Sequence, residues 1–134
     1  MSPSTVTGAL LALLAFTVGV SGMCRDVGGS IGTWVDDGSA AGLVKSKCSG
    51  LNRGTDSWRK RIKVKDVCGN VARNTPIATF VGKKYRGHAA ILVRCGRDGV
   101  QVYDQTPHRP VGLRLVPWGG AVASQNAENF YTIH

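Results

Sequence analysis

The amino-acid sequence predicts a single α+β domain in which a short N-terminal helix packs on an antiparallel β-meander. Three observations lead to this class. One capped helical segment precedes several β-branched or apolar runs, glycine-rich turns separate those runs, and the four cysteines form an even set suited to disulfides. A length of 134 residues, 43% of them hydrophobic, fits one globular domain and excludes both two large domains and a solvated disordered chain.

Residues 1–22 are expected to be a secretory signal peptide, which leaves residues 23–134 as the single domain. The apolar run 8–20 is shorter than the roughly 20 residues that a bilayer requires, and it ends in the small residues that signal peptidase accepts. The start of the chain carries no Lys or Arg, so a buried N-terminal helix is the alternative. No other segment is long enough to span a membrane. We therefore expect a secreted, extracellular protein and a monomer.

The helix is expected over residues 40–47. Asp36, Asp37 and Ser39 are capping residues, and lysines occupy the last turn, where the helix dipole favours cations. Strands are expected over five further runs that are rich in β-branched or apolar residues, and the Asp98-Gly99 turn predicts a hairpin between the second and the third of them. These runs are 75–80, 88–93, 100–104, 111–116 and 129–133.

The chain is strongly basic, with a formal net charge of +9, and no charged side chain precedes Arg25. Such a charge favours polyanionic surroundings, for example cell-wall polymer, acidic glycan, anionic lipid or nucleic acid. The densest basic stretch is 58–65, and it alternates like a strand after Arg61. Its lysines either protect an exposed edge strand from aggregation or form a docking stripe for anions.

Four cysteines, Cys24, Cys48, Cys68 and Cys95, follow the expected signal peptide. In a small secreted chain they indicate two disulfides and an oxidising compartment. Three pairings are possible. Pairing Cys24 with Cys48 and Cys68 with Cys95 is preferred, because each bond then joins neighbouring segments. The cysteines lack the close spacing of zinc ligands, so neither a metal nor another cofactor is expected.

One histidine and one carboxylate are candidates for catalysis. His88 opens one strand and Asp104 closes the next, and the hairpin between them brings both to the same end of the sheet. A carboxylate in that place can orient an imidazole, as the third member of a catalytic triad does. A purely structural pair is the alternative. His108 and His134 are read as exposed and ordinary.

Several sequence blocks resemble the small NlpC-like amidases, which are papain-like cysteine hydrolases related to the CHAP domains and to bacterial amidase effectors. The most specific block has Gly87-His88-Ala89-Ala90 followed by Val102-Tyr103-Asp104-Gln105; the others are 55–59, 76–80 and 126–130. The resemblance implies a helix that carries a nucleophilic Cys at its N-terminus, His88 as the base, and Asp104 as its orienting acid. It also implies orienting or substrate contacts for Ser39, Trp58 and Gln105.

The nucleophile position departs from that family. The matching segment reads Gly38-Ser39-Ala40-Ala41, so Ala40 stands where the sulfur is expected. Cys48 cannot replace it, because eight helical residues rise about 12 Å. Loss of a triad nucleophile costs on the order of a millionfold in turnover. The alanine indicates a natural pseudoenzyme or a deliberate Cys-to-Ala change, and the sequence does not choose between them.

The sequence thus predicts an NlpC-like amidase homologue, inactive or impaired, that binds peptidoglycan peptides or another anionic cell-wall polymer. The alternative is a cationic secreted antimicrobial or host-interaction protein that uses the scaffold without catalysis. A nuclease or nucleic-acid binder is the least favoured class. His88 and His108 are the only internal histidines for acid/base cleavage, and no aromatic residues interleave the basic ones for base stacking.

Overall fold

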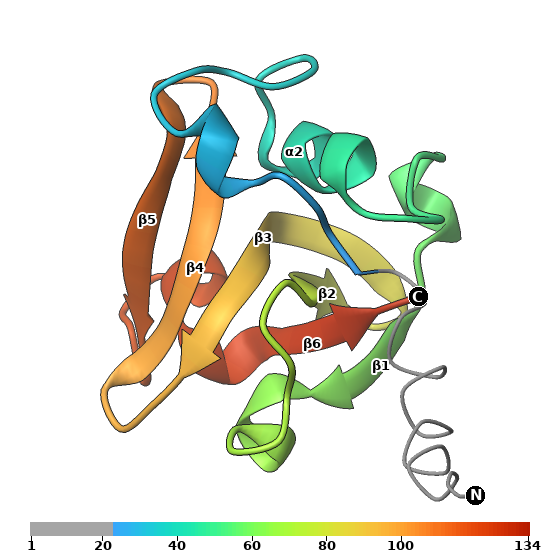
Figure 1. Cartoon of the computed structure of the whole chain (residues 1–134). Coiled ribbons are helices and arrows are strands. Elements are labelled where there is room, and N and C mark those ends of the chain that lie inside the picture. The colour runs from blue at the N-terminus through green and yellow to red at the C-terminus, as the bar shows by residue number, and fades with distance from the viewer. Residues whose placement is uncertain (1–22) are drawn as a thin grey trace, which may run out of the picture.

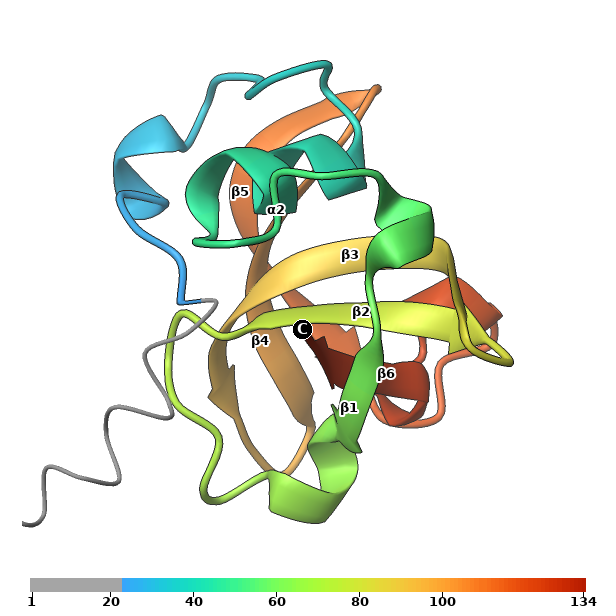
Figure 2. The same ribbon diagram turned by 90° about the vertical axis from the view of Figure 1, so that its right-hand side faces the viewer.

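The computed structural model describes residues 23–134, and the expected signal peptide lies outside them. Within this range one six-stranded antiparallel sheet has the strand order β1-β6-β2-β3-β4-β5. The α-helix α2 packs against β3 and β4 (Figures 1 and 2). None of the described helices is long and apolar enough to cross a membrane.

The elements follow the chain in an order that places the helix before the sheet. The helices are η1 (Gly28–Ser30), α2 (Ala40–Lys47), η2 (Thr55–Ser57), η3 (Val64–Val67), η4 (Ala123–Gln125) and η5 (Ala127–Asn129). The strands are β1 (Lys60–Lys63), β2 (Pro76–Val81), β3 (Lys84–Cys95), β4 (Gly99–Thr106), β5 (Arg109–Pro117) and β6 (Phe130–Ile133). The predicted α+β class and the helix over residues 40–47 are therefore confirmed.

Strand pairing departs from the predicted meander at one strand. β2, β3, β4 and β5 are sequential neighbours, but β6 lies between β1 and β2. The C-terminal strand thereby closes the gap between two early strands, which local sequence patterns do not show. β3 also begins at Lys84, earlier than the predicted 88. The basic strand β1 lies at the edge of the sheet, which agrees with the interpretation that its lysines protect an exposed edge strand.

Two hydrophobic clusters form the core. One contains Leu43 and Val44 of α2 together with Trp58 and Ile91, and the other contains Leu92 and its neighbours around Phe130. Because successive residues of a strand point to opposite faces, Ile91 and Leu92 supply both clusters from β3. Burial on both faces explains why the central strand reads as a continuous apolar run instead of alternating.

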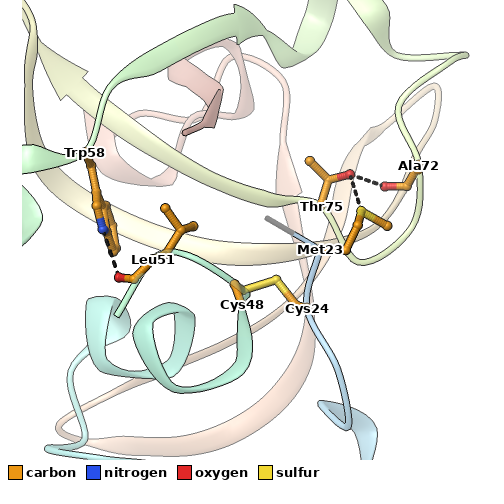
Figure 3. The surroundings of a disulfide bond; sticks show 7 residues. All are labelled: Met23, Cys24, Cys48, Leu51, Trp58, Ala72 and Thr75. Atoms are coloured by element: carbon orange, nitrogen blue, oxygen red, sulfur yellow. Dashed lines mark hydrogen bonds between the residues drawn. A yellow bond between two sulfur atoms is a disulfide. The ribbon is translucent and has the colours of Figure 1, made fainter. Parts of the chain in front are cut away.

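Two disulfides join segments that are adjacent along the chain. Cys24 bonds to Cys48 and Cys68 to Cys95, which confirms the preferred pairing. The first bond attaches the N-terminal segment to the residue that follows α2, as Figure 3 shows. Figure 3 also shows the indole of Trp58 donating to the carbonyl of Leu51, at 3.2 Å. This end of α2 is therefore held to the core by a covalent bond and by packing.

Candidate functional site

A bulge in β3 determines where His88 lies. Residues 86–88 stand opposite the single residue Thr79 of β2, and the pairing register shifts there. The Thr79 hydroxyl fills the bulge: it accepts from the backbone N–H of His88 at 2.9 Å and donates to the carbonyl of Arg86. Gly87 has φ +107°, and a Cβ on it would lie 2.4 Å from the Thr79 Oγ1. Glycine is thus required beside the histidine, and the bulge aims the imidazole.

The predicted contact between His88 and Asp104 is present. His88 Nε2 lies 2.8 Å from Asp104 Oδ2, and the two side chains are 6% and 0% exposed. Arg114 of β5 also donates to Asp104 Oδ2 through Nε at 2.9 Å and through Nη2. An ionised carboxylate can only accept, so His88 Nε2 carries the proton of this hydrogen bond.

Asp104 stays ionised although it is fully buried. Burial alone would raise the pKa of its carboxyl, but hydrogen bonds from His88 and Arg114, together with their positive charge, lower the pKa to about 2. Arg109 Nη2 lies 3.6 Å from the second oxygen, Oδ1. Within the described residues Oδ1 is a buried side-chain oxygen without a hydrogen-bond partner. The ionised carboxylate therefore fixes the orientation of the imidazole through its hydrogen bond with His88 and places a negative charge 2.8 Å from Nε2.

Gln105 connects β4 to the N-terminus of α2. Its side chain is fully buried. Its Oε1 accepts from the N–H of Val35, and its Nε2 donates to the carbonyls of Val35 and Ser39, all at 2.8 Å. Asp104 thus contacts the imidazole while the next residue holds the helix N-terminus. Of these two residues Asp104 faces His88, as predicted, whereas Gln105 bonds to backbone groups at the start of the helix.

The N-terminus of α2 carries a side-chain cap and an alanine. Ser39 Oγ accepts from the backbone N–H of Gly42 at 2.9 Å and donates to Asp37 Oδ1 at 2.6 Å. The hydrogen bonds from the Ser39 hydroxyl and its backbone N–H lower the pKa of Asp37. Ala40, 9% exposed, is the first residue of the helix, and it belongs to the same hydrophobic cluster as Ala89, which follows His88. The helix N-terminus thus packs on the face of the sheet that Ala89 shares, whereas His88, the preceding residue, packs edge-to-face against Phe130 of the other cluster, with ring centroids 6.4 Å apart.

Trp58, an expected substrate contact, lies in the hydrophobic core. Trp58 is fully buried, and its ring packs edge-to-face against Tyr85 with ring centroids 5.1 Å apart. A tryptophan with no exposed surface cannot touch a substrate, so the expected substrate contact is wrong and Trp58 serves the core. His108 and His134 are exposed, as expected. Among residues 23–134, no group of three or more His, Cys, Asp or Glu could hold a metal ion.

Three further residues of this site were not found from the sequence. Arg114 and Arg109 lie on β5 and reach Asp104 only because β5 pairs with β4. Trp34 is 53% exposed, and its indole donates to the carbonyl of Thr106 at 2.9 Å, one residue beyond Gln105. The two arginine contacts cross the hairpin between β4 and β5, and the Trp34 contact joins segments 72 residues apart. Only Trp34 had a local signal: it lies two residues before Asp36, one of the predicted capping residues.

Comparison with known proteins assigns the chain to a family. The family model described as domesticated amidase effector 2 matches residues 11–133. A domesticated amidase effector 2 from Ixodes scapularis is 38% identical over 135 residues, covering 96% of this chain and 95% of that protein. The chain belongs to the domesticated amidase effector 2 family. The predicted relation to amidases is thereby confirmed at the level of the family.

A solved structure supports the fold independently. The type 6 secretion amidase effector 2 (Tae2) is similar with a TM-score of 0.68, covering 84% of this chain and 93% of that chain. Its sequence identity is 20%, so this likeness concerns the fold alone. The described part of this chain therefore shares its overall fold with a type 6 secretion effector.

Proposed function

We propose that this member of the domesticated amidase effector 2 family binds peptidoglycan peptides at the N-terminus of α2 and does not hydrolyse them through a thiol. The single observation behind the proposal is Ala40, the first residue of α2, which stands where the resemblance to NlpC-like amidases implies a nucleophilic Cys. The family name supports an amide bond as the target. A cell-wall peptide follows from the resemblance to NlpC-like amidases.

The lack of a nucleophile is supported by the state of the cysteines. All four are disulfide-bonded, and no free cysteine exists in residues 23–134. A thiol at a helix N-terminus is readily deprotonated and attacks as a thiolate, whereas an alanine methyl cannot attack a carbonyl. The two disulfides also support an oxidising, extracellular location for the protein.

Binding does not require the sulfur. The formal charge of +9 attracts anionic cell-wall material. The exposed indole of Trp34, fixed by its bond to the Thr106 carbonyl, offers a flat surface near the helix N-terminus. These features together suit a short peptide that carries carboxylates.

Restoring the thiol tests the vacant position. We expect Ala40→Cys to cleave purified muropeptides, seen as new products by liquid chromatography, while the parent protein produces none. Ala41→Cys is the matched control, because the next residue of a helix points about 100° away. Ala40→Cys combined with His88→Ala should lose the gained activity. Cleavage by the parent, or a folded Ala40→Cys without activity, would show that the nucleophile has been placed wrongly.

A binding measurement tests whether the protein binds peptidoglycan peptides. The parent protein should bind muropeptides in low-salt buffer, where electrostatic attraction is least screened, and Trp34→Ala should weaken that binding. No affinity at low salt would end the proposal. Bacterial killing that persists undiminished in both His88→Ala and Trp34→Ala would instead favour the cationic antimicrobial alternative.

A further inference from the structure

A second surface of the sheet combines leucines with arginines. Gln101 of β4 stands directly between Arg94 of β3 and Leu115 of β5, so the three side chains lie in one row on one face. Leu113 lies in the next row on the same face, because it pairs with Tyr103. Leu113 and Leu115 are 51% and 50% exposed, which makes this part of the sheet apolar and open. We name Arg94, Arg97, Gln101, Leu113 and Leu115 the β5 patch.

The charge of the β5 patch is positive. Arg94, Arg97, Gln101 and Leu115 line a surface hollow of about 480 Å³, in which Asp98 is the one acidic lining residue. Arginine guanidinium groups match the geometry of phosphate and can bind it with two parallel hydrogen bonds. The hollow therefore suits a phosphate that lies beside an apolar surface.

The β5 patch is separate from the amidase-family site. The turn between β3 and β4, which carries Arg97, lies at the end of the sheet far from α2 (Figure 1). β5 is also an edge strand of the sheet. The arginines of the patch therefore lie away from the helix N-terminus (Figure 1), while Leu113 follows Gly112, which pairs with Asp104.

We propose that the β5 patch docks on the surface of an anionic phospholipid membrane. The arginines would contact lipid phosphates while Leu113 and Leu115 enter the boundary between headgroups and acyl chains. A free polyanion would neutralise the arginines but offer nothing to the half-exposed leucines. Nucleic acid would require exposed aromatic rings for stacking, and the patch carries none. The proposal is independent of peptide binding and would stand if that failed.

Vesicle sedimentation tests the proposal with the intact chain. The probe is a vesicle of phosphatidylglycerol and phosphatidylcholine in equal parts, compared with one of phosphatidylcholine alone. We expect binding to the first and little to the second. Leu113→Ser with Leu115→Ser should weaken partitioning roughly tenfold or more, because two half-exposed leucines lose their apolar contact. Arg94→Gln with Arg97→Gln should weaken it by a similar factor.

The opposite edge of the sheet provides the matched control. β1 also combines an exposed isoleucine, Ile62 at 44%, with the flanking cations Arg61 and Lys63. Ile62→Ser, and Arg61→Gln with Lys63→Gln, change the same chemistry and the same net charge away from the β5 patch. These variants should bind vesicles within about twofold of the parent. Equal losses at both edges would overturn the proposal in favour of binding by net charge alone.

A fluorescence measurement on a third variant tests the proposal even if the leucine-to-serine variants fold poorly. Leu115→Trp should shift its fluorescence to the blue when anionic vesicles are added and should not shift with free inorganic phosphate or an oligonucleotide. Absence of that shift with vesicles, or the same shift with the oligonucleotide, would refute membrane docking. A concentration-dependent dimer in analytical ultracentrifugation that Leu113→Ser abolishes would show that a second copy covers the patch instead.

Discussion

Replacing Arg114 should destabilise the protein at neutral pH but not at low pH. The guanidinium of Arg114 bonds to the fully buried carboxylate of Asp104, whose pKa is lowered from 3.8 to about 2. Each unit of pKa difference between the folded and unfolded states corresponds to about 1.4 kcal/mol, so the ionised carboxylate contributes about 2 kcal/mol at pH 7. His88 and Arg114 share that contribution, and the Arg114 side chain is 24% exposed. We therefore expect Arg114→Met to cost about 1 kcal/mol.

The sign of the pH dependence follows from the depressed pKa. Stability from Asp104 is fully present above pH 4 and is lost as pH falls through about 2, because the unfolded chain binds the proton first. Once Asp104 is protonated, Arg114 has no charged partner. The difference in unfolding free energy between parent and Arg114→Met should thus shrink toward zero between pH 4 and pH 2. Methionine retains the length of the apolar stem, so lost packing contributes little.

Urea unfolding followed by tryptophan fluorescence at several pH values measures this difference. Arg109→Met is the matched control on the same strand: its ion pair with Asp104 is longer, at 3.6 Å, and its side chain is 49% exposed. Exposed pairs contribute well under about 1 kcal/mol, so the control should be close to the parent at every pH. An Arg114→Met difference that stays constant from pH 7 to pH 2 would refute the electrostatic explanation and indicate lost packing.

Three further predictions concern the helix and its attachments. Ser39→Ala removes the cap and should lower the unfolding free energy by about 1 kcal/mol, whereas Ser46→Ala on the exposed side of the helix should be nearly neutral; thermal melts compare them. Gln105→Ala leaves buried backbone groups unpaired and should cost about 2–3 kcal/mol, with faster amide hydrogen exchange in the loop before α2; unchanged exchange would contradict its anchoring role. Replacing Cys24 and Cys48 by Ala opens a bond with a sequence separation of 24 and should cost about 3 kcal/mol, measured by urea unfolding; a loss below about 1 kcal/mol would show that packing alone holds this end.

Local patterns predicted the helix and most strands correctly because their determinants are close in sequence. The Ser39 cap and the lysines in the last turn set the bounds of α2, and the apolar runs set β2, β3, β4 and β5. The turn between β3 and β4 brought His88 and Asp104 together, as its position predicted. The even cysteine count predicted two disulfides, and neighbouring segments proved to be the bonded ones.

The misplaced residue and the missed residues share one physical cause. Trp58 stood in a basic, polar stretch, yet its ring is buried against Tyr85 from a distant strand. Arg114 reaches Asp104 from the neighbouring strand of the sheet. The Trp34 indole bonds to the carbonyl of Thr106, which is 72 residues away in sequence. Contacts between different elements depend on which strands pair and in which register, and a local pattern does not name the partner of a strand.

The sequence by itself determined which chemical groups this protein has: an alanine at the start of a capped helix, one histidine with a carboxylate across a hairpin, four cysteines and a large positive charge. The tertiary structure alone decided how they are used. It inserted β6 between β1 and β2, turned Asp104 to the imidazole and Gln105 to the helix, and engaged every described cysteine in a disulfide. Side-chain identity is a local property, whereas a contact requires two segments to be brought together by the packing of the whole domain.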